Sequence, residues 1–114
     1  MTIRTRQAED LDGVRALLEA AGLPVEGLEA TDGWVAGEPG RPIGHVALER
    51  TGDAAVLRSL VVAPAVRGQG LARRLMERAE REAGNRPLLL KTQTIGAWVE
   101  RRGYRHAGLA QIPE

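Results

Sequence analysis

Six consecutive residues could bind a phosphate group through their backbone: Arg67, Gly68, Gln69, Gly70, Leu71 and Ala72. Glycines let an anion approach backbone N–H groups closely, and Arg67 adds a positive charge. Residues 71–83 form an amphipathic segment, and the first N–H groups of a helix lack internal partners and carry partial positive charge. The pattern therefore predicts an anion site, with a pyrophosphate as the expected ligand. The alternative is a turn that only connects a strand to a helix.

Two better-known phosphate motifs do not fit this turn. A Walker loop needs a Lys followed by Ser or Thr after its last glycine, whereas Leu71 and Ala72 stand there. A dinucleotide fingerprint tolerates Ala72 as its third small residue, but it also needs an acidic residue about twenty positions further on. That region, residues 88–91, contains no carboxylate. Nicotinamide binding is therefore disfavoured.

The periodicity of apolar residues around the turn predicts a mixed α+β fold. Strands are expected at residues 2–6, 33–37, 43–50, 54–62, 87–92 and 104–109. Helices are expected at residues 11–21, 25–30, 71–83 and 95–102. The fourth strand is almost continuously apolar, which is typical of a central strand. We therefore expect a mostly antiparallel sheet in which the fourth and fifth strands pair in parallel, flanked by helices.

Length and composition restrict the class of protein. The 114 residues suit one domain with one core, and 43% of them are apolar. Phe is absent and aromatic residues make up 3%, so aliphatic side chains must fill that core. The net charge of +1 argues against a general nucleic-acid or membrane-surface protein.

Several kinds of site and location are disfavoured by what the sequence lacks. The absence of cysteine excludes disulfides, thiolate nucleophiles and cysteine metal sites. His45 and His106 lie far apart without ligand spacing, so we expect no metal and interpret both as ordinary strand residues. No long apolar run and no signal-peptide core is present, so a cytoplasmic location without a membrane segment is expected.

The order of these motifs resembles the GNAT acyltransferase superfamily. The resemblance rests on four motifs in chain order: Val62-x-Pro64, Arg67-x-x-Gly70-x-Ala72, the helix that follows, and Gly103-Tyr104. It implies a single acetyltransferase domain over residues 1–114 that uses acetyl-CoA as co-substrate and acetylates a small-molecule amine. The glycine turn would hold the diphosphate. The pantetheine arm would contact Leu60, Val61 and Val62, where the fourth and fifth strands splay apart.

A narrower similarity is to the arsenic-resistance N-acetyltransferases of this superfamily. It is carried by Gly22-Leu23-Pro24, Gly27-Leu28, Leu57-Arg58-Ser59-Leu60, Leu89-Leu90-Lys91-Thr92-Gln93-Thr94 and Pro113-Glu114. Related enzymes act on amino-acid toxins, so the similarity implies a small, acidic, amino-acid-like acceptor. Members usually continue beyond the Pro-Glu pair. The chain is therefore expected to be short of the last strand, and either to differ in substrate or to complete its sheet through a partner chain, as in a homodimer.

Two positions depart from common patterns of the superfamily and leave the proton-handling groups open. Val56 stands where many members carry Glu, and Val99 stands where many carry a Tyr acid. Glu49 is the nearest candidate for a base, with a solvent-facing charge as the alternative. The loss of both usual groups also leaves open a catalytically silent CoA-binding or interaction module, or a relative that shares only the fold.

Arg58 and Ser59 are the remaining candidates. An Arg inside an apolar strand is costly unless it is paired or faces a ligand. Arg58 therefore either forms an ion pair with an acid of the first helix or holds an acidic acceptor through a bidentate contact. Ser59 is expected to point to the opposite face of the strand, where it is a candidate hydrogen-bond donor in the catalytic site.

Overall fold

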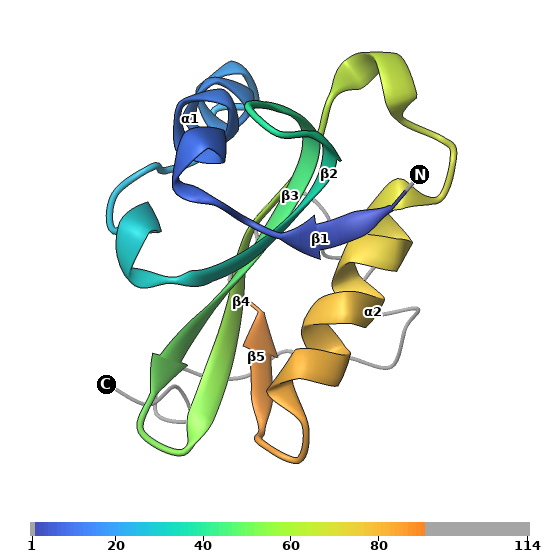
Figure 1. The fold of residues 1–114 in the computed structure, drawn as a ribbon. Helices are drawn as coiled ribbons and strands as arrows, with labels where there is room; N and C mark the ends of the chain where they lie inside the picture. The colour runs from blue at the N-terminus through green and yellow to red at the C-terminus, as the bar shows by residue number, and fades with distance from the viewer. Residues whose placement is uncertain (1, 91–114) are drawn as a thin grey trace.

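The computed structural model describes residues 2–90, which form a five-stranded sheet flanked by two helices (Figure 1). The strands are β1 (Ile3–Thr5), β2 (Asp32–Glu38), β3 (Arg41–Thr51), β4 (Ala54–Val62) and β5 (Leu88–Leu90). The helices are α1 (Leu11–Ala20) and α2 (Leu71–Ala83). Three single turns of 3-10 helix connect them: η1 (Ala8–Asp10), η2 (Leu28–Ala30) and η3 (Pro64–Val66).

The strands are arranged in the sheet in chain order, from β1 to β5. The first four strands pair antiparallel with their neighbours, whereas β4 and β5 pair in parallel because α2 carries the chain back between them. The predicted mixed sheet is therefore confirmed. The helix expected at residues 25–30 is reduced to η2. The elements expected at 95–102 and 104–109 lie outside the described residues.

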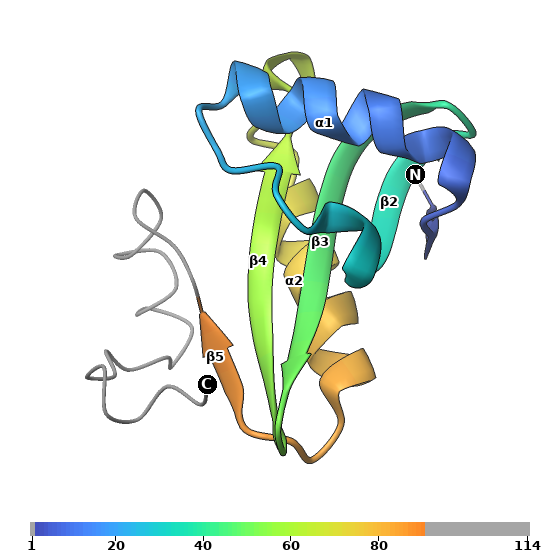
Figure 2. The same ribbon diagram turned by 90° about the vertical axis from the view of Figure 1, so that its left-hand side faces the viewer.

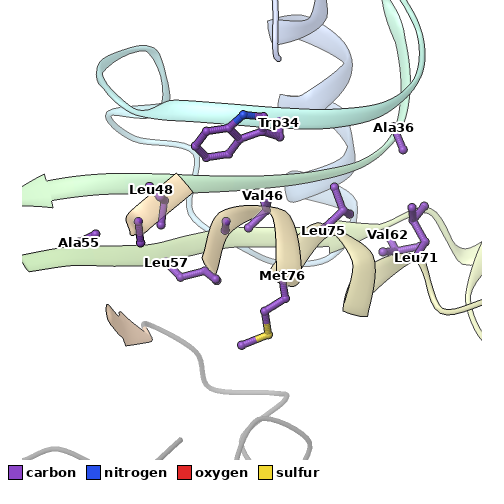
Figure 3. Close-up of a cluster of buried hydrophobic side chains, with 12 residues drawn as sticks. Trp34, Ala36, Val46, Leu48, Ala55, Leu57, Val62, Leu71, Leu75 and Met76 are labelled. Carbon is purple, nitrogen blue, oxygen red and sulfur yellow. The ribbon is translucent and has the colours of Figure 1, made fainter. Parts of the chain in front are cut away.

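The two helices cover opposite faces of the sheet, α1 on one side and α2 on the other (Figure 2). The apolar side of α2 is formed by Leu71, Leu75, Met76, Ala79 and Ala83, which recur at helical spacing and are all buried. They pack on alternate residues of β2, β3 and β4 (Figure 3). A second, smaller cluster under α1 joins Val14 and Leu18 to Leu28, Val35 and Val61.

Gly44 sets how closely α2 approaches β3. A Cβ atom at this position would lie 3.0 Å from side-chain atoms of both Leu71 and Leu75. The first turn of α2 therefore rests directly on the backbone of β3, and the glycine turn before it is held against the same end of the sheet.

The carboxylate of Asp10 joins three segments at the β1 edge of the described sheet. Its side chain is fully buried and accepts hydrogen bonds from both terminal nitrogens of Arg4, at 2.8 and 2.9 Å. It also accepts the backbone N–H groups of Gln7 at 2.8 Å and Gly40 at 2.9 Å. The bond with Arg4, opposed by burial and assisted by the two N–H groups, holds the pKa of Asp10 well below its usual range.

We expect Asp10→Asn to lower the free energy of unfolding by about 3 kcal/mol, because it leaves the Arg4 guanidinium without its buried partner. Asp12→Asn is the matched control, since Asp12 lies two residues further on, in the first turn of α1, with a fully exposed side chain. Urea denaturation of both variants measures the difference. A depressed carboxyl pKa stabilises the fold above the unfolded pKa, so the wild-type advantage should start to decrease as the pH falls below about 4 and should be lost only near the depressed pKa of the folded state. Equal midpoints for the two variants would contradict this role.

Candidate functional site

The glycine turn has the backbone geometry of an anion site. Gly68 and Gly70 have φ angles of 82° and 79°, in the left-handed region that glycine adopts without strain. The first helical hydrogen bond of α2 runs from the N–H of Arg74 to the carbonyl of Gly70. The backbone N–H groups of residues 71–73 make no capping hydrogen bond with any described residue. They are therefore available to a ligand at the positive end of the helix dipole.

Arg67 connects this turn to the end of β4. Its Nε donates to the carbonyl of Val62 at 3.1 Å, while the residue as a whole is exposed. This hydrogen bond links the start of the turn to the end of β4. Arg73, in the first turn, is exposed and lies 3.7 Å from Glu77, an arrangement that contributes little to stability.

A β-bulge interrupts β4 just before its last residues. His45 pairs with Val61 and Ala47 pairs with Arg58, so two residues of β4, Ser59 and Leu60, lie opposite one residue of β3. Ser59 has a φ of 57°, a left-handed conformation that is unfavourable for a residue with a side chain. Such a conformation persists only where the surrounding structure maintains it.

His45 provides that support. Its ring is fully buried, with Nδ1 lying 2.9 Å from the carbonyl oxygen of Ser59 and Nε2 lying 3.0 Å from Nη1 of Arg6. An arginine only donates and a carbonyl only accepts, so the ring is neutral, with its proton on Nδ1 donating to Ser59. Burial, opposed by this bond and assisted by the Arg6 charge, lowers the pKa of His45 to about 4.

Arg6 is in turn held by the segment around η2. Its Nη2 donates to the carbonyls of Leu28 at 3.0 Å and Thr31 at 2.6 Å, and its Nη1 contacts the Thr31 hydroxyl at 3.3 Å. A Cβ atom at Gly33 would overlap the guanidinium, so only glycine leaves room for it there. A continuous chain of hydrogen bonds therefore runs from the η2 segment through Arg6 and His45 to the bulge.

The three polar candidates from the sequence lie together on the α1 side of the sheet. Arg58 donates to Glu49 at 3.1 Å, to the carbonyl of Glu26 at 2.8 Å and, through Nε, to the Ser59 hydroxyl at 3.3 Å. Glu49 is the direct cross-strand neighbour of Val56, and its side chain is 42% exposed. A carboxylate therefore lies beside Val56, the position at which many members of the superfamily resembled by the sequence carry Glu.

Two sequence-based expectations are wrong. The acidic partner of Arg58 is Glu49 on β3, because the two residues are diagonal neighbours on one face of the β3–β4 ladder, and no acid of α1 pairs with it. The Ser59 hydroxyl lies beside Arg58 and does not point to the opposite face, because the bulge breaks the alternation of side chains at that residue.

His45 and Arg6 support the candidate site through hydrogen bonds, and sequence reasoning missed both. A weak signal was present, since His45 stands in the apolar run from Gly44 to Leu48, where a buried polar side chain needs a partner. Its two partners are Arg6, which directly follows β1, and the carbonyl of Ser59 on β4, and a pattern along β3 alone does not reveal them.

The described residues contain neither a metal-ligand cluster nor a membrane-spanning helix. Among residues 2–90 there is no group of three or more His, Cys, Asp or Glu side chains that could hold a metal ion. In the same part of the chain, no helix has the length and apolar character needed to cross a bilayer.

Comparisons with known proteins agree with this geometry. A family model described as "Acetyltransferase (GNAT) domain" matches residues 29–106. The fold is similar to N-acetylglutamate synthase from Neisseria gonorrhoeae complexed with coenzyme A and N-acetyl-glutamate, with a TM-score of 0.86 and 24% identity. That match covers 99% of this chain and 30% of the synthase, so the chain spans less than a third of its length. The same synthase complexed with coenzyme A and L-arginine matches with a TM-score of 0.83, 23% identity and 29% coverage of its chain.

A smaller protein matches along its whole length. A GCN5-related N-acetyltransferase from Ralstonia eutropha JMP134 has a TM-score of 0.70 and 21% identity, and the match covers 99% of this chain and 96% of that one. No curated protein sequence matches the chain.

The buried neutral His45 should give the unfolding free energy a distinct pH dependence. An unfolded His binds a proton near pH 6.5, whereas the folded residue does so only near pH 4. Stability should therefore fall as the pH is lowered through this window, by up to about 1.4 kcal/mol per pH unit from this one group. Urea denaturation at several pH values should show a shallower slope for His45→Asn, which does not titrate. Parallel slopes for wild type and variant would show that His45 is not held neutral.

Proposed function

The chain belongs to the GNAT acetyltransferase family, and we propose that it transfers the acetyl group of acetyl-CoA to the amine of a small acceptor. The observation that carries this proposal is the pairing of two backbone features at one end of the molecule. The bulge in β4 frees a peptide N–H from the ladder, and the glycine turn presents the unpaired N–H groups of α2. One suits a thioester carbonyl and the other suits a diphosphate.

In this proposal the donor lies along the end of β4 and across the turn. The diphosphate binds the backbone of residues 67–72, with Arg67 adding charge. The pantetheine arm runs beside Leu60, Val61 and Val62. The linkage between Arg67 and the Val62 carbonyl supports this arrangement, because it holds the turn at a fixed place relative to the strand. The splay of β4 from β5 stays a prediction, since β5 is described only to Leu90.

The chemistry requires few protein groups. The neutral amine attacks the thioester carbon, the C–S bond breaks, and the amine proton is lost while the CoA thiolate leaves or is protonated. Glu49 is the carboxylate we propose to accept that proton, directly or through water, because it stands beside Val56 and is partly exposed. The Ser59 hydroxyl lies in the same cluster. Much of the rate is expected from holding the two reactants in place.

For the acceptor we propose a small amino acid with an acidic side chain, bound beside Arg58. A guanidinium has five N–H groups. Arg58 uses three of them in hydrogen bonds with residues in the described part of the chain, which leaves two for the carboxylate of an acceptor. The N-acetylglutamate synthase complex offers a precedent among similar folds, since its ligand is N-acetyl-glutamate. The resemblance to arsenic-resistance acetyltransferases agrees with such an acceptor.

The donor site is tested by comparing Gly68→Ala with Gly52→Ala. Both glycines have positive φ, at 82° and 59°, and a Cβ atom at either would meet nothing within 4 Å. The backbone strain should therefore be similar, at about 1 kcal/mol in each case. Only Gly68 lies in the glycine turn before α2. We therefore expect only Gly68→Ala to weaken the binding of acetyl-CoA, with a Kd about tenfold higher, which corresponds to about 1.4 kcal/mol. Calorimetric titration with acetyl-CoA measures the Kd of each variant.

The same experiment tests the proposal as a whole. Acetyl-CoA should raise the Tm of the wild-type protein, as a ligand selective for the folded state must. The absence of any Tm shift at millimolar acetyl-CoA would contradict a donor site. Binding without release of free CoA over a broad panel of amines would instead favour a silent CoA-binding module.

The acceptor site is tested by Arg58→Ala. We expect it to raise KM for an acidic amino acid such as L-glutamate about tenfold or more, while the Kd for acetyl-CoA stays within about twofold. Arg50→Ala is the control, because Arg50 pairs with Asp32 on an exposed part of the sheet. Thiol detection gives the kinetics. If KM is unchanged and only the unfolding midpoint falls, the pair with Glu49 is structural.

A further inference from the structure

We propose that His45 is a positioning residue for the acetyl transfer, which fixes the peptide group that binds the thioester carbonyl. This inference rests on the proposed function and adds to it a residue that does not touch the substrate. The donor to the thioester is the N–H of Leu60, and its direction is set by His45 through the carbonyl of Ser59.

The geometry of one peptide bond carries the first step. The carbonyl of Ser59 and the N–H of Leu60 belong to the same trans peptide plane and therefore point in opposite directions. The carbonyl is directed at Nδ1 of His45, 2.9 Å away on β3. The N–H of Leu60 must therefore point away from the His45 ring. In a regular ladder this peptide would be fixed by β3 itself, but the bulge leaves it without a register partner.

The rigidity of His45 carries the second step. The ring of His45 is fully buried, and its Nε2 accepts a hydrogen bond from Nη1 of Arg6 at 3.0 Å. A rotation of the imidazole ring would therefore break this hydrogen bond and the one to Ser59 together. Arg6 is anchored by the carbonyls of Leu28 and Thr31. The peptide group between Ser59 and Leu60 is thus oriented by His45, which Arg6 holds in place. Such preorganisation of a hydrogen-bond donor lowers the activation barrier of acetyl transfer.

The bulge needs such a support because its own backbone is unfavourable. Ser59 has a φ of 57°, and a bulged strand that loses its support can relax toward a regular ladder. The diphosphate contacts lie in a different element, the turn before α2. Loss of His45 should therefore impair the chemical step and the hydrogen bond to the thioester much more than the binding of acetyl-CoA.

Four variants separate positioning from packing. His45→Leu removes the donor. His45→Asn keeps an N–H close to the place of Nδ1, whereas His45→Gln extends its N–H toward the place of Nε2 and serves as a polar control of similar size. Val35→Ala is the stability control, because Val35 is the buried cross-strand neighbour of His45 and its side chain has no hydrogen-bonding group.

The direct readout is the infrared carbonyl stretch of acetyl-CoA labelled with ¹³C in the acetyl group. Bound to wild type, the stretch should lie below that of a simple ¹³C-labelled acetyl thioester in an apolar solvent, because a hydrogen bond lowers the frequency of a carbonyl stretch. We expect that shift to be lost in His45→Leu, reduced in His45→Gln, and kept in His45→Asn and Val35→Ala. With the best amine of the panel, kcat should fall about 100-fold in His45→Leu, with Kd for acetyl-CoA within about threefold.

The outcomes distinguish this inference from the proposed function. If wild type does not bind acetyl-CoA, the proposed function fails and this inference fails with it. If wild type binds and the carbonyl stretch is unshifted, or is shifted equally in His45→Leu, only the inference is overturned. If His45→Leu does not fold, the pair His45→Asn and His45→Gln decides, since equal shifts and equal kcat in these two would exclude a role for a donor at Nδ1.

Discussion

The hydrogen bond from His45 to the carbonyl of Ser59 is the contact on which the described structure most depends. It lies where a central strand departs from regular pairing, and it is made in the dry interior, where an unpaired carbonyl or imidazole would be costly. Without it, the left-handed residue at the bulge would have no side-chain support on the β3 side.

The bulge also determines which side chains reach which core. Up to Leu57, odd-numbered residues of β4 face α2, and after the bulge the even-numbered Leu60 and Val62 take that face while Val61 faces α1. A regular strand would exchange Val61 with Val62 and place each against the wrong helix. The inserted residue is therefore compatible with the core because it places Val62 against α2 and Val61 against α1.

Most of the fold, and the glycine turn of the candidate site, could be predicted from the sequence because the signals are local. The glycine turn, the apolar spacing of α2 and the apolar fourth strand each depend on neighbours along the chain, and the parallel pairing of β4 with β5 follows from the helix between them. The orientation of Ser59 and the partner of Arg58 were predicted wrongly. The orientation of Ser59 depends on the inserted residue, which cannot be recognised in an apolar run such as Leu57 to Val62. The partner of Arg58 depends on the register between β3 and β4. His45 was overlooked because Arg6 and Ser59 contact it from segments that are distant in the sequence.

The order of the strands also bears on how the molecule assembles. β2, β3 and β4 are consecutive and form a meander, so their contacts close short loops, whereas β5 reaches β4 only after the whole of α2 has been placed. A nucleus built on the meander would contain the bulge and His45 before the glycine turn is positioned by α2. The two parts of the proposed site would then belong to different cooperative units, and amide exchange would resolve them as separate opening events, the turn opening at a lower free energy than the strand.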